Sequence, residues 1–167
     1  GLSTRLPILI FGYGNPSRGD DALGPQLVDR LDRLGAPELA GQIECLTDFQ
    51  LQVEHALDLD GRQLVLFVDA DLEAPPPWRL IPLTAADGVS FSTHAIRPEA
   101  VLRVFEEIHR RTPPPCFLLG IRGEAFELGA PLSRRAADHL QQALTLVLGL
   151  CHQPSAAVWR QHCTRHT

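Results

Sequence analysis

Lysine is absent from this chain of 167 residues, and all fifteen basic residues are arginine. Without lysine the protein cannot form a Schiff base with a carbonyl substrate, and it lacks the side chain with which a P-loop holds nucleotide phosphates. The arginines are scattered along the chain and the net charge is −5, which argues against a nucleic-acid-binding surface. These absences exclude Schiff-base enzymes and P-loop nucleotide-binding proteins, and they predict no nucleic-acid partner.

Long apolar runs and closely paired cysteines are also missing. No apolar stretch approaches the roughly 20 residues that a membrane-spanning helix needs. The N-terminus has neither the basic region nor the hydrophobic core of a signal peptide. None of the four cysteines stands in a C-x-x-C spacing. We therefore expect a cytoplasmic protein that does not contact a membrane and has no structural disulfide.

Strand-like and helix-like segments alternate along the chain. Apolar runs typical of strands occur at residues 6–11, 43–46, 64–68, 78–83 and 117–121, the fourth as an edge strand that tolerates Pro82. Apolar residues at helical spacing occur at residues 22–31, 50–59, 98–111 and 133–150. This alternation predicts a three-layer α/β/α sandwich with a mostly parallel, twisted sheet. Residues 1–150 would form one domain, and residues 151–167 a loosely attached tail.

Acidic residues stand where two of these strands end. Asp20 and Asp21 follow the first strand side by side, and Asp69 follows the third. Asp20 and Asp21 could simply cap the next helix, for which one aspartate is enough. A second, adjacent one favours a cation site, because like charges close together stay ionised when something positive joins them. His94 precedes a helix and is the candidate third ligand, since two carboxylates and an imidazole suit a borderline divalent ion.

Other kinds of site do not fit the sequence. A dinucleotide fingerprint would need glycine at the position of Ser17, and Pro16 removes a backbone donor there. The chain has no G-x-S-x-G nucleophile elbow. The cysteines and histidines in residues 151–167 match no zinc-finger spacing. We therefore expect no organic cofactor.

The loop after the first strand, "GYGNPSRGDDALG" at residues 12–24, closely resembles the signature of the nickel-iron hydrogenase maturation endopeptidases. The similarity continues through "LFVDAD" at 66–71, "STHAIRPEAVLRV" at 92–104 and "LLGIRGEAFELGAPLS" at 118–133. The resemblance implies a cytoplasmic, aspartyl-endopeptidase-like hydrolase that acts on a hydrogenase large-subunit precursor. Such a protease removes a short C-terminal extension after nickel has been inserted into that subunit.

The resemblance also implies roles for individual residues. By motif, Asp21, Asp69 and His94 would be the catalytic and metal-contacting residues, although many relatives have glutamate where this chain has Asp21. The nickel ion would arrive with the substrate. For cleavage, the metal could activate a water molecule, and Asp20 as a free carboxylate could accept its proton.

One departure from the family pattern concerns substrate selection. Many relatives have Asp-Gly-Gly after the second strand, whereas this chain has "TDFQLQVEHALDL" at residues 47–59 and retains only Asp48 of the three. The sequence is similar to the branch that serves NAD-reducing, bidirectional hydrogenases. Gln50 and His55 would then help Asp48 to select the large subunit.

Two other functions remain open on the residues alone. A non-catalytic chaperone could inspect nickel loading with the same fold, and an unrelated α/β hydrolase could act on small esters or nucleosides. The protease interpretation predicts the large-subunit precursor as the partner of a monomeric protein.

Overall fold

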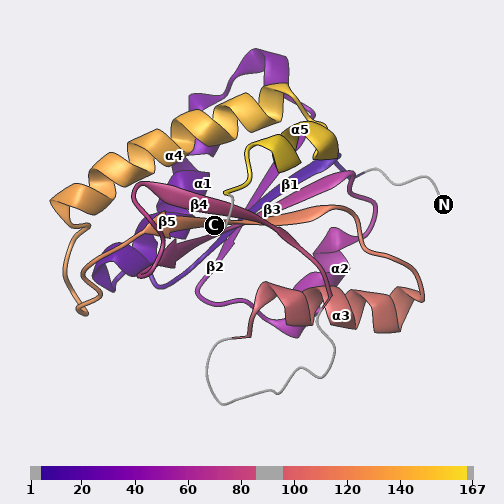
Figure 1. Ribbon diagram of the computed structural model, residues 1–167, viewed down its shortest axis with the longest axis horizontal. Coiled ribbons are helices and arrows are strands. Elements are labelled where there is room, and N and C mark those ends of the chain that lie inside the picture. The colour runs from indigo at the N-terminus through magenta and orange to yellow at the C-terminus, as the bar shows by residue number, and fades with distance from the viewer. Residues whose placement is uncertain (1–4, 86–95, 165–167) are drawn as a thin grey trace.

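The computed structural model describes residues 5–85 and 96–164. In these residues one sheet contains β1 (Ile8–Tyr13), β2 (Ile43–Asp48), β3 (Leu64–Asp71), β4 (Trp78–Leu83) and β5 (Cys116–Arg122). The strand order is β2-β1-β3-β5-β4 (Figure 1). All neighbours pair in parallel except β4, which runs antiparallel to β5 at the edge. The carboxyl ends of the four parallel strands therefore lie at the same end of the sheet. We call this end the carboxyl edge, as distinct from the lateral edge formed by β4.

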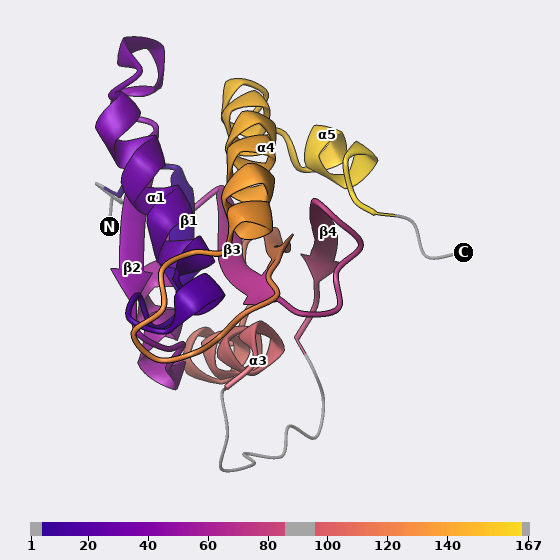
Figure 2. The ribbon, with the colours of Figure 1, turned by 90° about the vertical axis from the view of Figure 1, so that its left-hand side faces the viewer.

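Helices cover both faces of this sheet. They are α1 (Leu23–Leu34), α2 (Ala56–Leu59), α3 (Pro98–His109), α4 (Arg134–His152) and α5 (Ala156–Gln161), with 3-10 turns at Gly19–Ala22, Pro37–Leu39 and Val53–His55. The α1, α4 and α5 helices lie on one face, and α2 and α3 lie on the other (Figures 1 and 2). The three-layer sandwich predicted from the sequence is confirmed. No helix in the described ranges is both long and apolar enough to cross a bilayer.

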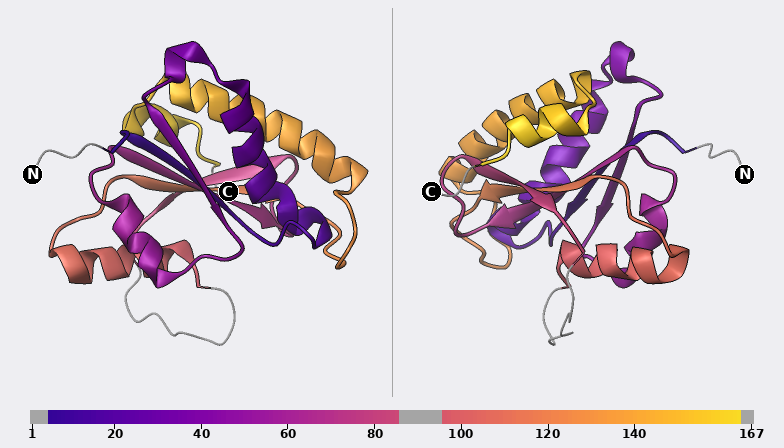
Figure 3. Two further views of the ribbon diagram at one scale, coloured as in Figure 1. Left: turned by 180° about the vertical axis from the view of Figure 1, so that it is seen from behind. Right: turned by 45° about the vertical axis from the view of Figure 1, so that its right-hand side comes forward.

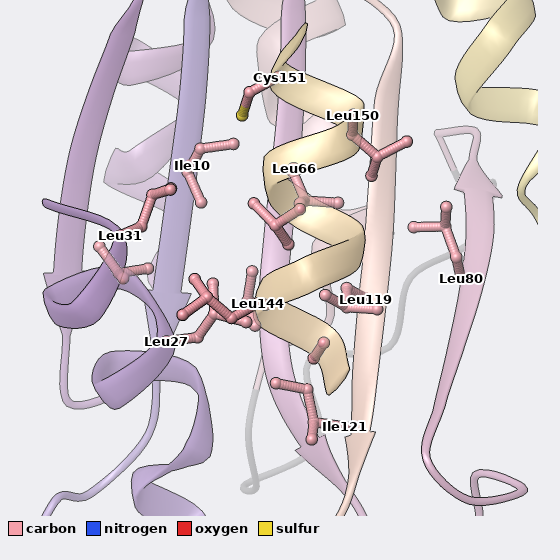
Figure 4. Packing of buried hydrophobic residues seen from close by; sticks show 14 of the residues in the cluster. Ile10, Leu27, Leu31, Leu66, Leu80, Leu119, Ile121, Leu144, Leu150 and Cys151 are labelled. Carbon is pink, nitrogen blue, oxygen red and sulfur yellow. The ribbon is translucent and has the colours of Figure 1, made fainter. Parts of the chain in front are cut away.

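Both faces of the central strands are buried, which explains their continuous apolar sequences. Successive side chains of a strand point to opposite faces, so Ile10 joins the cluster under α1 and α4 while Phe11 joins the cluster under α2 and α3. Figure 4 shows Leu144 and Leu150 of α4 in the same buried cluster as Ile10 and Leu66 of the sheet. Burial of this apolar surface is the main stabilising contribution to the fold.

Two segments differ in detail from the sequence prediction. The expected helix over residues 50–59 is an extended loop, the 3-10 turn Val53–His55 and the four-residue α2. The β3 strand continues to Asp71, so Asp69 lies inside the strand instead of following it. The edge strand at 78–83 and the helix start after Ser133 are confirmed, and the Ser133 hydroxyl accepts a hydrogen bond from the N–H of Ala136.

The expectation of a loosely attached tail is wrong for the described residues. Trp159 of α5 is fully buried and packs against Phe117 with ring centroids 5.4 Å apart. Its indole Nε1 donates to the carbonyl of Leu150 at 2.9 Å. Thr164 pairs with Leu80 of β4 through its backbone N–H, which donates to the Leu80 carbonyl at 2.8 Å. The α5 helix therefore belongs to the α4 layer beside the edge strand (Figure 3).

This packing predicts that Trp159→Ala destabilises the protein. Replacing a buried tryptophan by alanine leaves a cavity and typically costs about 3–5 kcal/mol of unfolding free energy. Arg160→Ala changes the exposed neighbour on the same short helix and is the matched control. Urea unfolding of both variants measures the difference, and equal unfolding midpoints would show that α5 does not contribute to the core.

Candidate active site at the carboxyl edge

Asp20, the first member of the acidic pair, is fully buried and accepts four hydrogen bonds. Its carboxylate accepts from the backbone N–H groups of Glu124 at 2.8 Å, Ala125 at 3.0 Å and Ser133 at 2.7 Å. The Ser133 hydroxyl also donates to it at 2.7 Å. Burial alone would raise the pKa of Asp20, but the hydrogen bonds from these residues outweigh it and lower the pKa below its usual value.

The expectation of a free carboxylate at Asp20 is therefore wrong. Both carboxylate oxygens are used to hold the loop after β5 and the first turn of α4. A lowered pKa also makes Asp20 a poor proton acceptor near neutral pH. Asp20 is a structural residue that fixes the shape of the carboxyl edge.

Asp21, the second member of the pair, lies partly exposed on a cavity. Its Oδ2 accepts a hydrogen bond from the N–H of Asn15 at 2.8 Å. Neither the 3-10 turn at 19–22 nor α1 has a side-chain hydrogen bond at its N-cap, so the capping interpretation of Asp21 is wrong. The cavity has a volume of about 370 Å³, and Asp21 and Asp69 both line it.

Glycines in the loop "GYGNPSRGDDALG" allow this arrangement. A Cβ atom on Gly12 would lie 2.4 Å from the carbonyl oxygen of Gly24, so both glycines permit α1 to pack directly against β1. Gly14 has φ +147°, and a Cβ there would lie 2.1 Å from the carbonyl oxygen of Asp21. The loop can therefore fold back closely enough to bring Asp21 to the end of β1.

Asp69 is a residue of this cavity whose pKa is strongly raised. Burial first, and then the negative charge of Asp21, raise the pKa of Asp69 to about 7. The N–H of Ala70 donates to its Oδ1 at 2.8 Å, and the hydroxyl of Tyr13 also forms a hydrogen bond with it; both bonds lower the pKa. Burial and the charge of Asp69 hold the pKa of Tyr13 well above its usual value, so Tyr13 stays a donor.

The loop after β2 forms one wall of the cavity. His55 accepts the N–H of Gln52 at Nδ1, at 2.8 Å, so its Nε2 carries the proton that is donated to Asp48 Oδ2 at 3.1 Å. The His55 ring also packs against Phe11, with centroids 4.5 Å apart. His55 therefore holds the loop in place, while Gln50 lines the cavity itself.

Two further cavities adjoin this one. A cavity of about 230 Å³ shares Gly14 and Phe49 with it, and a cavity of about 320 Å³ shares Asp69. The last is charged, with Asp71, Arg79 and Arg97 among its lining residues. We call the three together the edge groove. Its lining residues extend from the end of β2 to β4. Four strand spacings separate these two strands, about 19 Å, which roughly six extended residues would span.

The sequence-predicted residues are thus only partly brought together. Asp21 and Asp69 share one cavity although they are far apart in the chain, and His94 lies outside the described residues. Within residues 5–85 and 96–164 no three histidine, cysteine, aspartate or glutamate side chains are grouped to hold a metal ion. Sequence reasoning missed Tyr13 and Phe49. Tyr13 is the one tyrosine in the chain and stands inside the recognised motif, which was the available signal.

The fold was compared with known proteins. No protein-family profile matches the sequence, and no curated protein sequence matches it. Among solved structures, the [NiFe] hydrogenase maturation protease HycI from Thermococcus kodakarensis KOD1 is 23% identical, with a TM-score of 0.68 over 89% of this chain and 93% of its own. The hydrogenase maturating endopeptidase HybD from E. coli is 21% identical, with a TM-score of 0.66 over 90% and 94%. The chain therefore has the fold of these proteins.

The hydrogen bonds of Asp20 predict that Asp20→Asn is destabilising. An asparagine amide presents N–H donors where Asp20 offers an acceptor, so at least one of the four buried donors loses its partner, at about 1–3 kcal/mol each. A lowered pKa means that this contribution is present above the ordinary aspartate pKa of about 3.9 and is lost as the pH falls through the folded-state value. Denaturant unfolding should therefore show a difference from wild type at pH 7 that narrows in acid. A difference that persists at low pH would contradict this.

The charges in the cavity predict opposite effects of two variants on Asp69. Asp21→Asn removes a like charge and should lower the pKa of Asp69, whereas Tyr13→Phe removes a hydrogen bond to the carboxylate and should raise it. NMR titration of the Asp69 carboxyl carbon measures both shifts. Asp29→Asn removes a charge from the exposed surface of α1 and should leave the titration unchanged. A shift in the same direction for Asp21→Asn and Tyr13→Phe would refute this account of the cavity.

Proposed function

We propose that this protein is an endopeptidase that removes the C-terminal extension of a nickel-loaded [NiFe]-hydrogenase large-subunit precursor. The observation that carries the proposal is that Asp21 and Asp69, 48 positions apart, line one cavity at the carboxyl edge of this fold. Parallel α/β sheets bind their ligands at that edge. The solved structures with the same fold include proteins described as a [NiFe] hydrogenase maturation protease and a hydrogenase maturating endopeptidase.

In this proposal the nickel ion is part of the substrate. Asp21, Asp69 and His94 contact the metal that the precursor carries, and a metal-free precursor lacks that contact. Two carboxylates in one cavity repel each other, and after burial this repulsion is the next cause of the raised pKa of Asp69. A cation between them relieves the repulsion. The two carboxylates alone are a weak site, which suits an ion that arrives with other ligands already bound to it.

Proton transfer during peptide cleavage is not assigned to Asp20, because both of its carboxylate oxygens are held by hydrogen bonds. The pKa of about 7 describes Asp69 without a cation, and a nickel ion in contact with Asp69 would lower that pKa and keep the carboxylate ionised. Tyr13 and the N–H of Ala70 hold the carboxylate on the cavity. The peptide itself lies extended in the edge groove, whose length matches about six residues.

The finer assignments follow from the sequence. We propose that the substrate belongs to an NAD-reducing, bidirectional hydrogenase, and that Gln50 and Asp48 select it, since both line the edge groove. His55 acts on this selection indirectly through its hydrogen bond to Asp48. The protein would act as a monomer in the cytoplasm.

A cleavage assay distinguishes this function from the alternatives. Purified protein is incubated with nickel-loaded and with nickel-free precursor, and the mass of the precursor is measured. Loss of a C-terminal fragment from the nickel-loaded form alone supports the proposal. Binding without loss of mass would identify a chaperone, and neither binding nor cleavage would favour an unrelated hydrolase.

The role of Asp21 predicts a specific order of activities among its variants. Asp21→Asn keeps the shape and still accepts the N–H of Asn15, but it removes the charge that meets the cation. The loss of a charge contact of about 3 kcal/mol corresponds to roughly 100-fold slower processing of nickel-loaded precursor.

Asp21→Glu restores a carboxylate and should retain most of the activity. Both variants should melt near the wild-type temperature, because neither changes a helix cap. Asp29→Asn, on the exposed surface of α1, controls for the change in net charge and should process normally. An Asp21→Asn enzyme with wild-type activity would remove Asp21 from the proposed nickel contact.

A further inference from the structure

Three large apolar side chains are exposed on loops at the carboxyl edge. Phe49, Leu72 and Leu128 are 68%, 57% and 69% exposed. Phe49 directly follows β2, Leu72 directly follows β3, and Leu128 lies in the loop after β5. Because these strands are parallel, the three loops lie at the same edge of the sheet. We call these three side chains the apolar rim.

The backbone under the apolar rim is held by hydrogen bonds. The N–H of Phe49 donates to Asp48 Oδ1 at 2.7 Å. Beside Leu128, the N–H of Gly129 donates to the carbonyl of Ser17 at 2.7 Å. Leu72 follows Asp71, whose Oδ1 accepts the N–H groups of the two residues after Leu72. The rim side chains are therefore presented on ordered loops, which lowers the entropy lost when a partner binds.

The apolar rim adjoins the edge groove. Phe49 lines two of its three cavities. Leu72 adjoins Asp71, which lines the third. Leu128 precedes Gly129, whose N–H donates to the carbonyl of Ser17. Ser17 belongs to the loop after β1, which also carries Asn15 and Asp21 to the central cavity. A protein whose chain enters the groove therefore comes close to these loops.

We propose that the apolar rim is the docking surface for the folded body of the large-subunit precursor, while the edge groove takes only its extended C-terminal segment. This inference rests on the proposed function. Exposed apolar side chains gathered on one side of a protein mark protein–protein interaction sites. A short peptide needs only the groove, so the rim makes a folded protein the preferred substrate.

The chain contains a matched control for this surface. Leu34, Leu57 and Ile108 are 52%, 53% and 52% exposed and lie on α1, α2 and α3. Leu34 ends the helix that begins at the carboxyl end of β1, and Ile108 lies near the end of the helix that leads back to the start of β5. Both therefore lie toward the opposite edge of the sheet from the apolar rim.

The test compares two double variants in the full-length protein. Leu72→Ser with Leu128→Ser changes the rim without touching a residue that lines the groove, and Leu34→Ser with Ile108→Ser is the control. With nickel-loaded precursor, the rim variant should show KM raised about tenfold with little change in kcat. The control variant should keep the wild-type KM.

Each other outcome has a defined meaning. Equal KM values for the rim and control variants would overturn the docking proposal while leaving the protease function intact. A rim variant that changes sedimentation of the protein alone, with an unchanged KM, would assign the rim to a second copy and also overturn it. Failure of wild type to cleave the precursor would refute the proposed function itself.

A folding defect is checked by melting temperature. If the rim double variant melts below wild type, Leu72→Gln and Leu128→Gln are measured singly, because each keeps a longer side chain on its loop. A wild-type KM for both single variants would then overturn the proposal.

Discussion

The buried carboxylate of Asp20 is the constraint on which the carboxyl edge depends. It joins three segments, the turn after β1, the loop after β5 and the first turn of α4, through four hydrogen bonds. A buried charge without partners would be strongly destabilising, so these donors must stay in place whenever Asp20 is ionised. Because Asp20 is fixed inside, the next residue, Asp21, is carried to the cavity. The acidic pair therefore has divided roles, one structural and one at the candidate site.

Features of the fold that depend on local sequence could be predicted. The apolar runs of β1 and β3 are buried on both faces because helices cover both sides of the sheet. Pro82 marked β4 as an edge strand, since proline cannot donate a hydrogen bond to a second neighbour. Ser133 marked the start of α4, because its hydroxyl accepts an N–H of the first turn. In each case the information lies within a few residues of the feature that it specifies.

Features that depend on distant contacts could not be predicted in this way. Nothing near Asp20 indicates that its partners lie more than 100 residues further along the chain. The burial of Trp159 depends on the distant residue Phe117. The start of α5 did have a local signal, because the Ser155 side chain accepts the N–H of Val158. The candidate site also had one part that the sequence predicted and one part that it did not. The strand-end pattern brought Asp21 and Asp69 together correctly, while the contribution of Tyr13 required the geometry of the cavity.

In the proposed reaction, affinity for the precursor and selectivity for its nickel-loaded form come from different parts of the surface. Apolar contacts at the rim bind the folded precursor whether or not it holds a metal, because burial of apolar area does not depend on a buried charge. The contribution of Asp21 and Asp69 to binding does depend on the metal, since two nearby carboxylates favour a cation between them. A precursor without the cation gains nothing from this pair. Specificity is the difference between the binding free energies of the nickel-loaded and the nickel-free precursor. The carboxylates therefore need to contribute only this difference. A protein built this way can bind its partner first and commit to cleavage only when the ion is present.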